Sequence, residues 1–104
     1  MQENNSAKFI VRVDPEIADI IPGYLINREN DIAAIYDALE KKDLATVRIL
    51  GHNMKGSGGG YGFDAITDIG MLIEEAAKDG NDESIRLQVK RLEDYLLQIE
   101  IVYE

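Results

Sequence analysis

The sequence predicts an all-α protein: an antiparallel, up-and-down four-helix bundle with a short leading N-terminal helix. Apolar residues recur at spacings of three and four in four consecutive segments, which is typical of helices that bury one face. The connections between these segments are very short, and short connections make neighbouring helices antiparallel. The length of 104 residues suits one domain. We expect an N-terminal arm at residues 1–13 and the bundle at residues 14–104.

The arm has two parts. Residues 1–7 are polar, and we expect them to be frayed. In the second part, Phe9, Val11 and Val13 share one side of an alternating pattern that is typical of a short strand. No second strand candidate follows, and a single strand has nothing to pair with. We therefore interpret this part as an extended arm that packs against the helices.

Asp14-Pro15-Glu16 predicts a helix start, with an aspartate cap, a proline at the first helical position and an acidic first turn. Because Pro22 follows closely, this leading helix must be short, and Pro22 starts a longer one. The longer helix closes at Glu40-Lys41-Lys42, where cations suit a helix C-terminus. Its apolar face consists of Tyr24 or Leu25, Ile32, Ile35 and Leu39.

Asp43 is the expected cap of the next helix, whose apolar pattern continues through a cluster of glycines. The pattern consists of Leu44, Val47, Leu50 or Gly51, Met54, Gly58 and Tyr61. Each glycine costs about 1 kcal/mol relative to alanine inside a helix. We therefore predict a helix up to Tyr61 whose glycines provide access or close helix packing.

Two further helices complete the predicted bundle. Asp64 is the expected cap of the third helix, which Gly80-Asn81 ends in a left-handed conformation. The buried face of this helix consists of Ile66, Ile69, Ile73, Ala76 and Ala77. Asp82 begins the last helix, which has the most regular pattern: Ile85, Val89, Leu92, Leu96, Ile99 and Tyr103.

The composition excludes several classes of function. The net charge of −9 disfavours nucleic acid or an anionic membrane as a partner, because both bind basic surfaces. The chain has no cysteine and one histidine, which excludes disulfides and thiolate sites and argues against structural zinc. It contains no secretory signal and no apolar run long enough to span a bilayer, so we expect a cytoplasmic protein. From the initial methionine and the polar residues after it we expect a free-standing chain, with a domain of a larger sensor kinase as the open alternative.

The only histidine, His52, lies in a segment from Leu44 to Phe63 that contains no Asp or Glu. On a helical projection of about 100° per residue, His52 lies roughly 150° from the centre of the buried face. Its imidazole should therefore face solvent. Arg48 and Lys55 lie within one helical turn of it, and nearby cations favour the neutral, nucleophilic imidazole.

The surface around this histidine is suited to contact with another protein. Ala45 and Ile49 form a small apolar rim that the bundle core cannot use. Gly56 and Gly59 present no side chains, so a partner's backbone could approach the ring closely.

Other candidate sites are weaker. Gly51 to Gly56 has the spacing of a P-loop, but Ser57 follows in place of Lys-Ser/Thr and no strand precedes it. Ser57 itself has no base at helical spacing. Carboxylate pairs such as Glu74-Glu75, or Asp79 with Asp82, are interpreted as solvated helix surface.

The run His52-Asn53-Met54-Lys55-Gly56-Ser57, with small residues up to Gly62-Phe63, resembles the H-x-[hydrophobic]-K-G-[S/A] motif of histidine-containing phosphotransfer (HPt) domains. The likeness extends to domain length and helical layout. It implies a phosphocarrier of a two-component phosphorelay rather than an autonomous enzyme. His52 would accept a phosphoryl group on Nε2 from a receiver-domain aspartate and pass it to another, and Lys55 would balance its charge.

The resemblance also implies the partners: response-regulator receiver domains and a sensor histidine kinase. A receiver would dock on Ala45, Arg48, Ile49, Gly56 and Gly59, and would supply Mg²⁺, so that this chain needs no metal or cofactor of its own. Two alternatives remain open. One is the phosphoacceptor domain of a chemotaxis-type kinase, phosphorylated by a separate ATP-binding domain. The other is a helical adaptor in which His52 is incidental.

Overall fold

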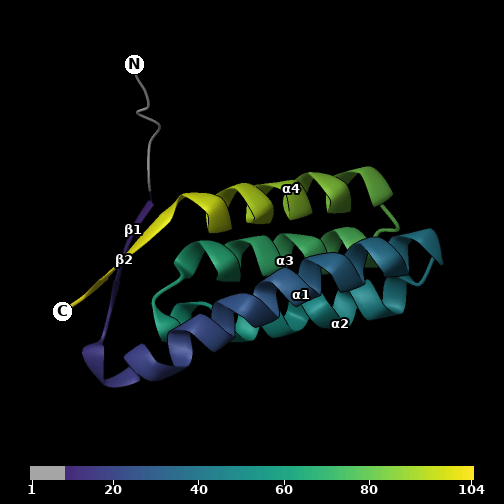
Figure 1. Cartoon of the computed structure of the whole chain (residues 1–104). Helices are drawn as coiled ribbons and strands as arrows, with labels where there is room; N and C mark the ends of the chain where they lie inside the picture. The colour runs from purple at the N-terminus through teal and green to yellow at the C-terminus, as the bar shows by residue number, and fades with distance from the viewer. Residues whose placement is uncertain (1–8) are drawn as a thin grey trace, which may run out of the picture.

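The computed structural model describes residues 9–104, most of which lie in four helices. These are α1 (Ile21–Glu40), α2 (Leu44–Ser57), α3 (Asp64–Lys78) and α4 (Asp82–Gln98). Figure 1 shows the helices side by side, with the α1–α2 and α3–α4 connections at one end and the α2–α3 connection at the other. The predicted four helices are confirmed. The prediction of fraying for residues 1–7 lies outside the described residues. None of the described helices is long and apolar enough to cross a bilayer.

The helix boundaries follow from local capping. The leading helix is a 3₁₀ helix, η2 (Pro15–Ile20), which runs directly into α1, and the Asp14 side chain accepts a hydrogen bond from the Glu16 N–H at 2.9 Å. Asp43 caps α2 as predicted, because its carboxylate accepts from the Thr46 N–H at 3.1 Å. Gly80 ends α3 with a φ of +69°, a conformation that glycine adopts without cost.

One predicted cap is displaced by one residue. Asp64 is the first residue of α3, and Phe63 occupies the cap position without a side-chain hydrogen bond. Asp82 begins α4 as predicted, and the side chain of Asn81 caps the helix, accepting from the Ser84 N–H at 3.0 Å. Asp64 and Asp82 both lie in the first turn of their helices, where a negative charge interacts favourably with the helix dipole.

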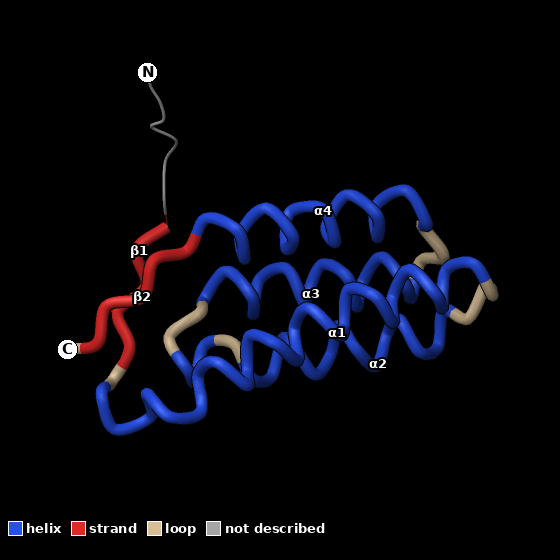
Figure 2. Tube along the Cα trace, viewed as in Figure 1, coloured by secondary structure: helices blue, strands red, loops and turns tan. Residues whose placement is uncertain are grey.

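The ends of the described chain form a small parallel sheet, which corrects two predictions. Strand β1 (Phe9–Val13) pairs with β2 (Ile99–Tyr103), and Val11 lies opposite Ile101. Residues 9–13 therefore have a partner strand, and the last helix ends at Gln98 rather than reaching Tyr103. Three of the five residues of β2 are β-branched and favour an extended backbone: Ile99, Ile101 and Val102. Figure 2 shows both strands at the end of the bundle that carries the α2–α3 connection.

A single glycine allows β1 to pack against this connection. Gly62 has a φ of +97°, a left-handed conformation that side chains disfavour. A Cβ at this position would also come within 3.0 Å of the Arg12 carbonyl oxygen in β1. Glycine at position 62 therefore allows both the left-handed turn before α3 and the close packing of β1 against it.

The second helix is shorter than predicted because a side chain is inserted into its hydrogen bonds. The Thr67 hydroxyl accepts from the Gly59 N–H at 2.8 Å and donates to the Lys55 carbonyl at 3.1 Å. In a continuing α-helix these two backbone groups would bond to each other. The chain instead leaves α2 at Ser57 and forms a 3₁₀ turn, η3 (Gly59–Tyr61). A Cβ on Gly58 would lie 2.7 Å from the Thr67 nitrogen, so only glycine allows this approach.

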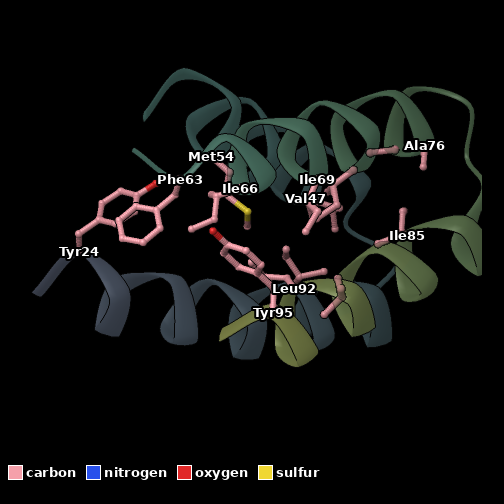
Figure 3. Close-up of a cluster of buried hydrophobic side chains, with 14 of the residues drawn as sticks. Tyr24, Val47, Met54, Phe63, Ile66, Ile69, Ala76, Ile85, Leu92 and Tyr95 are labelled. Atoms are coloured by element: carbon pink, nitrogen blue, oxygen red, sulfur yellow. The ribbon is translucent and has the colours of Figure 1, made fainter. Parts of the chain in front are cut away.

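The core runs the length of the bundle, and Figure 3 shows its side chains converging from all four helices. At one end, Phe63 is fully buried and its ring stacks on that of Tyr24, with centroids 5.8 Å apart. The largest completely buried side chains are Phe63, Ile21, Ile35, Met54, Ile66, Ile69, Ile73, Ile85, Leu92, Val13, Val47 and Val89. The predicted apolar faces of all four helices contribute to this list.

Candidate functional site

His52 lies in the middle of α2, and 64% of its side chain is exposed. Val47, Gly51 and Met54 on the opposite side of the helix are buried. The outward direction predicted from the helical projection is therefore correct. The imidazole also lines a shallow surface pocket together with Arg48, Ile49 and Glu74.

A carboxylate from α3 reaches the imidazole. Glu74 Oε2 lies 3.1 Å from Nδ1 of His52, and its Oε1 accepts a hydrogen bond from Lys55 Nζ at 2.8 Å. Only 9% of the Glu74 side chain is exposed. The prediction that Glu74 belongs to solvated helix surface is therefore wrong.

A sequence signal for Glu74 does exist. The residue lies four positions after Gly70 and three before Ala77, and both of these are buried. Glu74 thus falls on the apolar face of its own helix. A charged residue at such a position is almost never buried without a partner, which points to a polar contact across the helix interface.

The charge state of Glu74 follows from its neighbours. The hydrogen bond from Lys55 lowers the pKa of the Glu74 carboxyl below its usual value, burial opposes this, and the contact with His52 lowers it further. Glu74 is therefore a carboxylate at neutral pH. A carboxylate only accepts hydrogen bonds, so the neutral imidazole presents a proton on Nδ1 and keeps a lone pair on Nε2. The arrangement selects Nε2 as the nucleophile.

The other predicted site residues divide into two groups. Ala45, Arg48, Ile49 and Gly56 are exposed on α2, with Ile49 at 55%. A Cβ placed on Gly56 would have no heavy atom within 4 Å, so this surface is open. Gly59 is also exposed, but it lies beyond the end of α2 in η3. It therefore does not continue the helical face of His52 as predicted.

The Ser57 side chain takes part in contacts between α1 and α2. Its hydroxyl lies 2.9 Å from the Tyr24 hydroxyl, and Nη1 of Arg28 donates to it at 3.4 Å. Arg28 also pairs with Asp31 at 2.8 Å and lies over the Tyr24 ring, 4.5 Å from the centroid. These contacts join α1 to the end of α2, and neither of the two described partners of Ser57, Tyr24 and Arg28, is a general base.

Replacing Glu74 with glutamine is expected to lower the free energy of unfolding in a pH-dependent way. The folded-state pKa of Glu74 lies below its usual value of 4.5. Its stabilising contribution is therefore complete above that value and is lost as the pH falls through the lower, folded-state pKa. Urea unfolding at neutral pH should show Glu74→Gln to be less stable than the wild type, and the difference should shrink below pH 4.5.

Glu75→Gln is the matched control, because Glu75 is an exposed neighbour on the same helix. It should show no such difference at neutral pH. A constant gap between Glu74→Gln and the wild type down to strongly acidic pH would contradict the charged network.

One comparison with known proteins gives a match that spans the residues around His52. A family model described as "Hpt domain" matches residues 24–101. The matched span begins in α1 and ends in β2, and it includes His52, Lys55 and Glu74. Searches of curated proteins and of solved structures found no match to this chain.

Proposed function

Because the chain belongs to the Hpt domain family, whose members take part in phosphotransfer in two-component signalling, we propose that it carries a phosphoryl group on His52 between receiver-domain aspartates. The observation that carries this proposal is the contact of His52 with Glu74. It couples an exposed imidazole to a buried carboxylate through Nδ1. Nε2 is thereby left free to accept the group.

The transfer needs little from this chain besides positioning and charge balance. The Nε2 lone pair attacks the phosphorus of the receiver's aspartyl phosphate, the new N–P bond forms, and the P–O bond to the aspartate breaks. The aspartate departs as a carboxylate. Because Nδ1 keeps its proton, the phosphorylated ring gains positive charge, which the carboxylate of Glu74 at 3.1 Å stabilises. The reverse steps return the group to a second receiver.

Lys55 and Arg48 balance the charge of the phosphoryl group in this proposal. Lys55 Nζ is anchored by Glu74 at 2.8 Å, and 39% of its side chain remains exposed next to His52. The receiver supplies Mg²⁺ from its own acidic pocket. The buried carboxylate beside His52 belongs to Glu74, which is already paired with Lys55, so this chain does not need to hold the metal ion itself.

The partners that we propose are receiver domains and the sensor histidine kinase that feeds them. Ala45, Ile49 and Gly56 give them a small, exposed apolar surface beside His52. The chain acts as a carrier in this scheme, because the phosphoryl group both arrives from and leaves to another protein.

The test is a phosphotransfer assay with purified receiver domains that have been phosphorylated by acetyl phosphate and Mg²⁺. The wild type should acquire an acid-labile, base-stable label, and His52→Gln should acquire none. Equal labelling of His52→Gln would disprove the role of His52. Labelling only by an ATP-charged kinase domain would assign the chain to a chemotaxis-type kinase. If neither donor labels the protein, the helical adaptor is the remaining interpretation of its function.

Lys55→Ala is expected to slow the transfer, or to shorten the lifetime of the phosphohistidine, by about tenfold. This corresponds to the loss of one charge-assisted hydrogen bond at the reacting group. Helical circular dichroism should be retained because Lys55 borders the exposed face. Lys90→Ala, which removes an exposed lysine paired with Asp94 on α4, is the control. Loss of helicity in Lys55→Ala would show instead that the residue is structural.

A further inference from the structure

Helices α2 and α3 touch backbone to backbone at two glycines. A Cβ on Gly51 would lie 2.7 Å from the Glu74 nitrogen and 2.9 Å from the Gly70 carbonyl oxygen. A Cβ on Gly70 would lie 2.5 Å from the Lys55 nitrogen and 2.7 Å from the Gly51 carbonyl oxygen. Backbone atoms inside helices cannot rotate out of the way as a side chain can. Any larger residue at either position must therefore push the two helices apart.

This contact lies directly beneath the reactive residues. Gly51 precedes His52 in α2, and its hydrogen faces the backbone nitrogen of Glu74. Gly70 lies one helical turn before Glu74 in α3 and faces the backbone of Lys55. The two glycines therefore set the distance between the helix that carries Glu74 and the helix that carries its two partners.

The reach of Glu74 depends on that distance. Its two carboxylate oxygens make contacts of 3.1 Å to His52 and 2.8 Å to Lys55. Hydrogen bonds weaken steeply once the heavy atoms are more than about 3.5 Å apart. Packed helices normally lie about 8–10 Å apart, and the separation depends on the side chains at the contact. A residue larger than glycine at the contact would increase the separation of the helices and lengthen both contacts.

We propose that Gly51 and Gly70 are positioning residues for the transfer: by holding α2 and α3 in close contact, they keep Glu74 at Nδ1 of His52 and so maintain the tautomer whose Nε2 is nucleophilic. This inference rests on the proposed function of His52. In the other tautomer, Nε2 carries the proton and has no lone pair with which to attack phosphorus. Glycine has a lower helix propensity than alanine, and close packing at the site offsets that cost.

The experiment compares the wild type with Gly70→Ala and Gly51→Ala by ¹⁵N NMR of the His52 ring at a pH where the ring is neutral. The wild type should show the Nδ1–H tautomer, and both variants should show a mixture. Phosphorylation of His52 by phosphoramidate, a small donor that needs no docking surface, should slow by about tenfold. Gly23→Ala is the control, because Gly23 lies in α1 with open space around it.

Glu74→Asp keeps the proposal testable if the alanine variants fail to fold. It shortens the side chain by one methylene and leaves the glycine contact intact, so it should produce the same tautomer mixture in a folded protein. Wild-type ring signals and rates in Glu74→Asp, or in a folded Gly70→Ala, would overturn the inference. The ring signals are measured without phosphate, so they stand even if the wild type accepts no phosphoryl group and the proposed function fails.

Discussion

A leucine in place of Gly56 is expected to lower the rate of transfer from a phosphorylated receiver by about a hundredfold or more. Gly56 lies one helical turn after His52, where neighbouring side chains are about 5–6 Å apart. A leucine there would stand where the receiver must approach, and a displacement of about 1 Å at the reacting atoms can cost about a hundredfold. Single-turnover phosphotransfer kinetics measure the loss.

The fold should survive this substitution. A Cβ at position 56 meets no heavy atom within 4 Å, and leucine has a higher helix propensity than glycine. Urea unfolding should show equal or greater stability, and phosphoramidate should still label His52. The control is Gly23→Leu: Gly23 lies in α1 and also has open space around it, so this substitution should leave the transfer rate unchanged. Unchanged transfer kinetics in Gly56→Leu would show that this part of α2 does not belong to the docking surface.

Truncation of Phe63 to alanine is expected to lower the free energy of unfolding by about 3–5 kcal/mol. Phe63 is completely buried, and its ring stacks on Tyr24 where the chain turns from η3 into α3. The substitution removes apolar contacts and leaves a cavity at the point where α1, the glycine turn and α3 meet. Such a loss is a large share of the stability of a small domain, which is typically about 5–15 kcal/mol.

The control for this prediction is Leu97→Ala. Leu97 is 85% exposed at the end of α4, so its truncation should change the free energy of unfolding by about 0.5 kcal/mol or less. If the two substitutions lower the free energy of unfolding equally, the buried packing of Phe63 does not make the large contribution to stability that is predicted here. Urea or thermal unfolding followed by circular dichroism measures both.

The sequence predicts what depends on a single helix and misses what depends on a contact between elements. The outward direction of His52 follows from the angular spacing of the buried residues in α2 alone. The end of α2 does not, because Thr67 from the next helix inserts into its hydrogen bonds. The position of Glu74 on the apolar face of α3 indicates a polar contact but does not identify it, because the partners His52 and Lys55 are on a different helix.

The second strand illustrates a different difficulty. Ile99 and Tyr103 continue the spacing of three and four set by the preceding helix, so the periodicity does not mark where α4 ends. The same residues, with Ile101 between them, also satisfy the alternation of a strand. Two readings of the pattern therefore overlap, and pairing with a strand near the start of the chain decides between them.

The parallel sheet has a consequence for the order of folding. Phe9 pairs with Ile99, and the Arg12–Glu104 ion pair spans 92 residues, so these contacts close a loop almost as long as the chain. The entropy of that closure must be supplied by structure formed earlier, and an isolated two-stranded sheet is at best marginally stable. The neighbouring helices α2 and α3 can associate first because only a short turn separates them. We therefore expect the sheet to form after α2 and α3 have associated, and its long-range pairing raises the contact order of the fold, which slows folding.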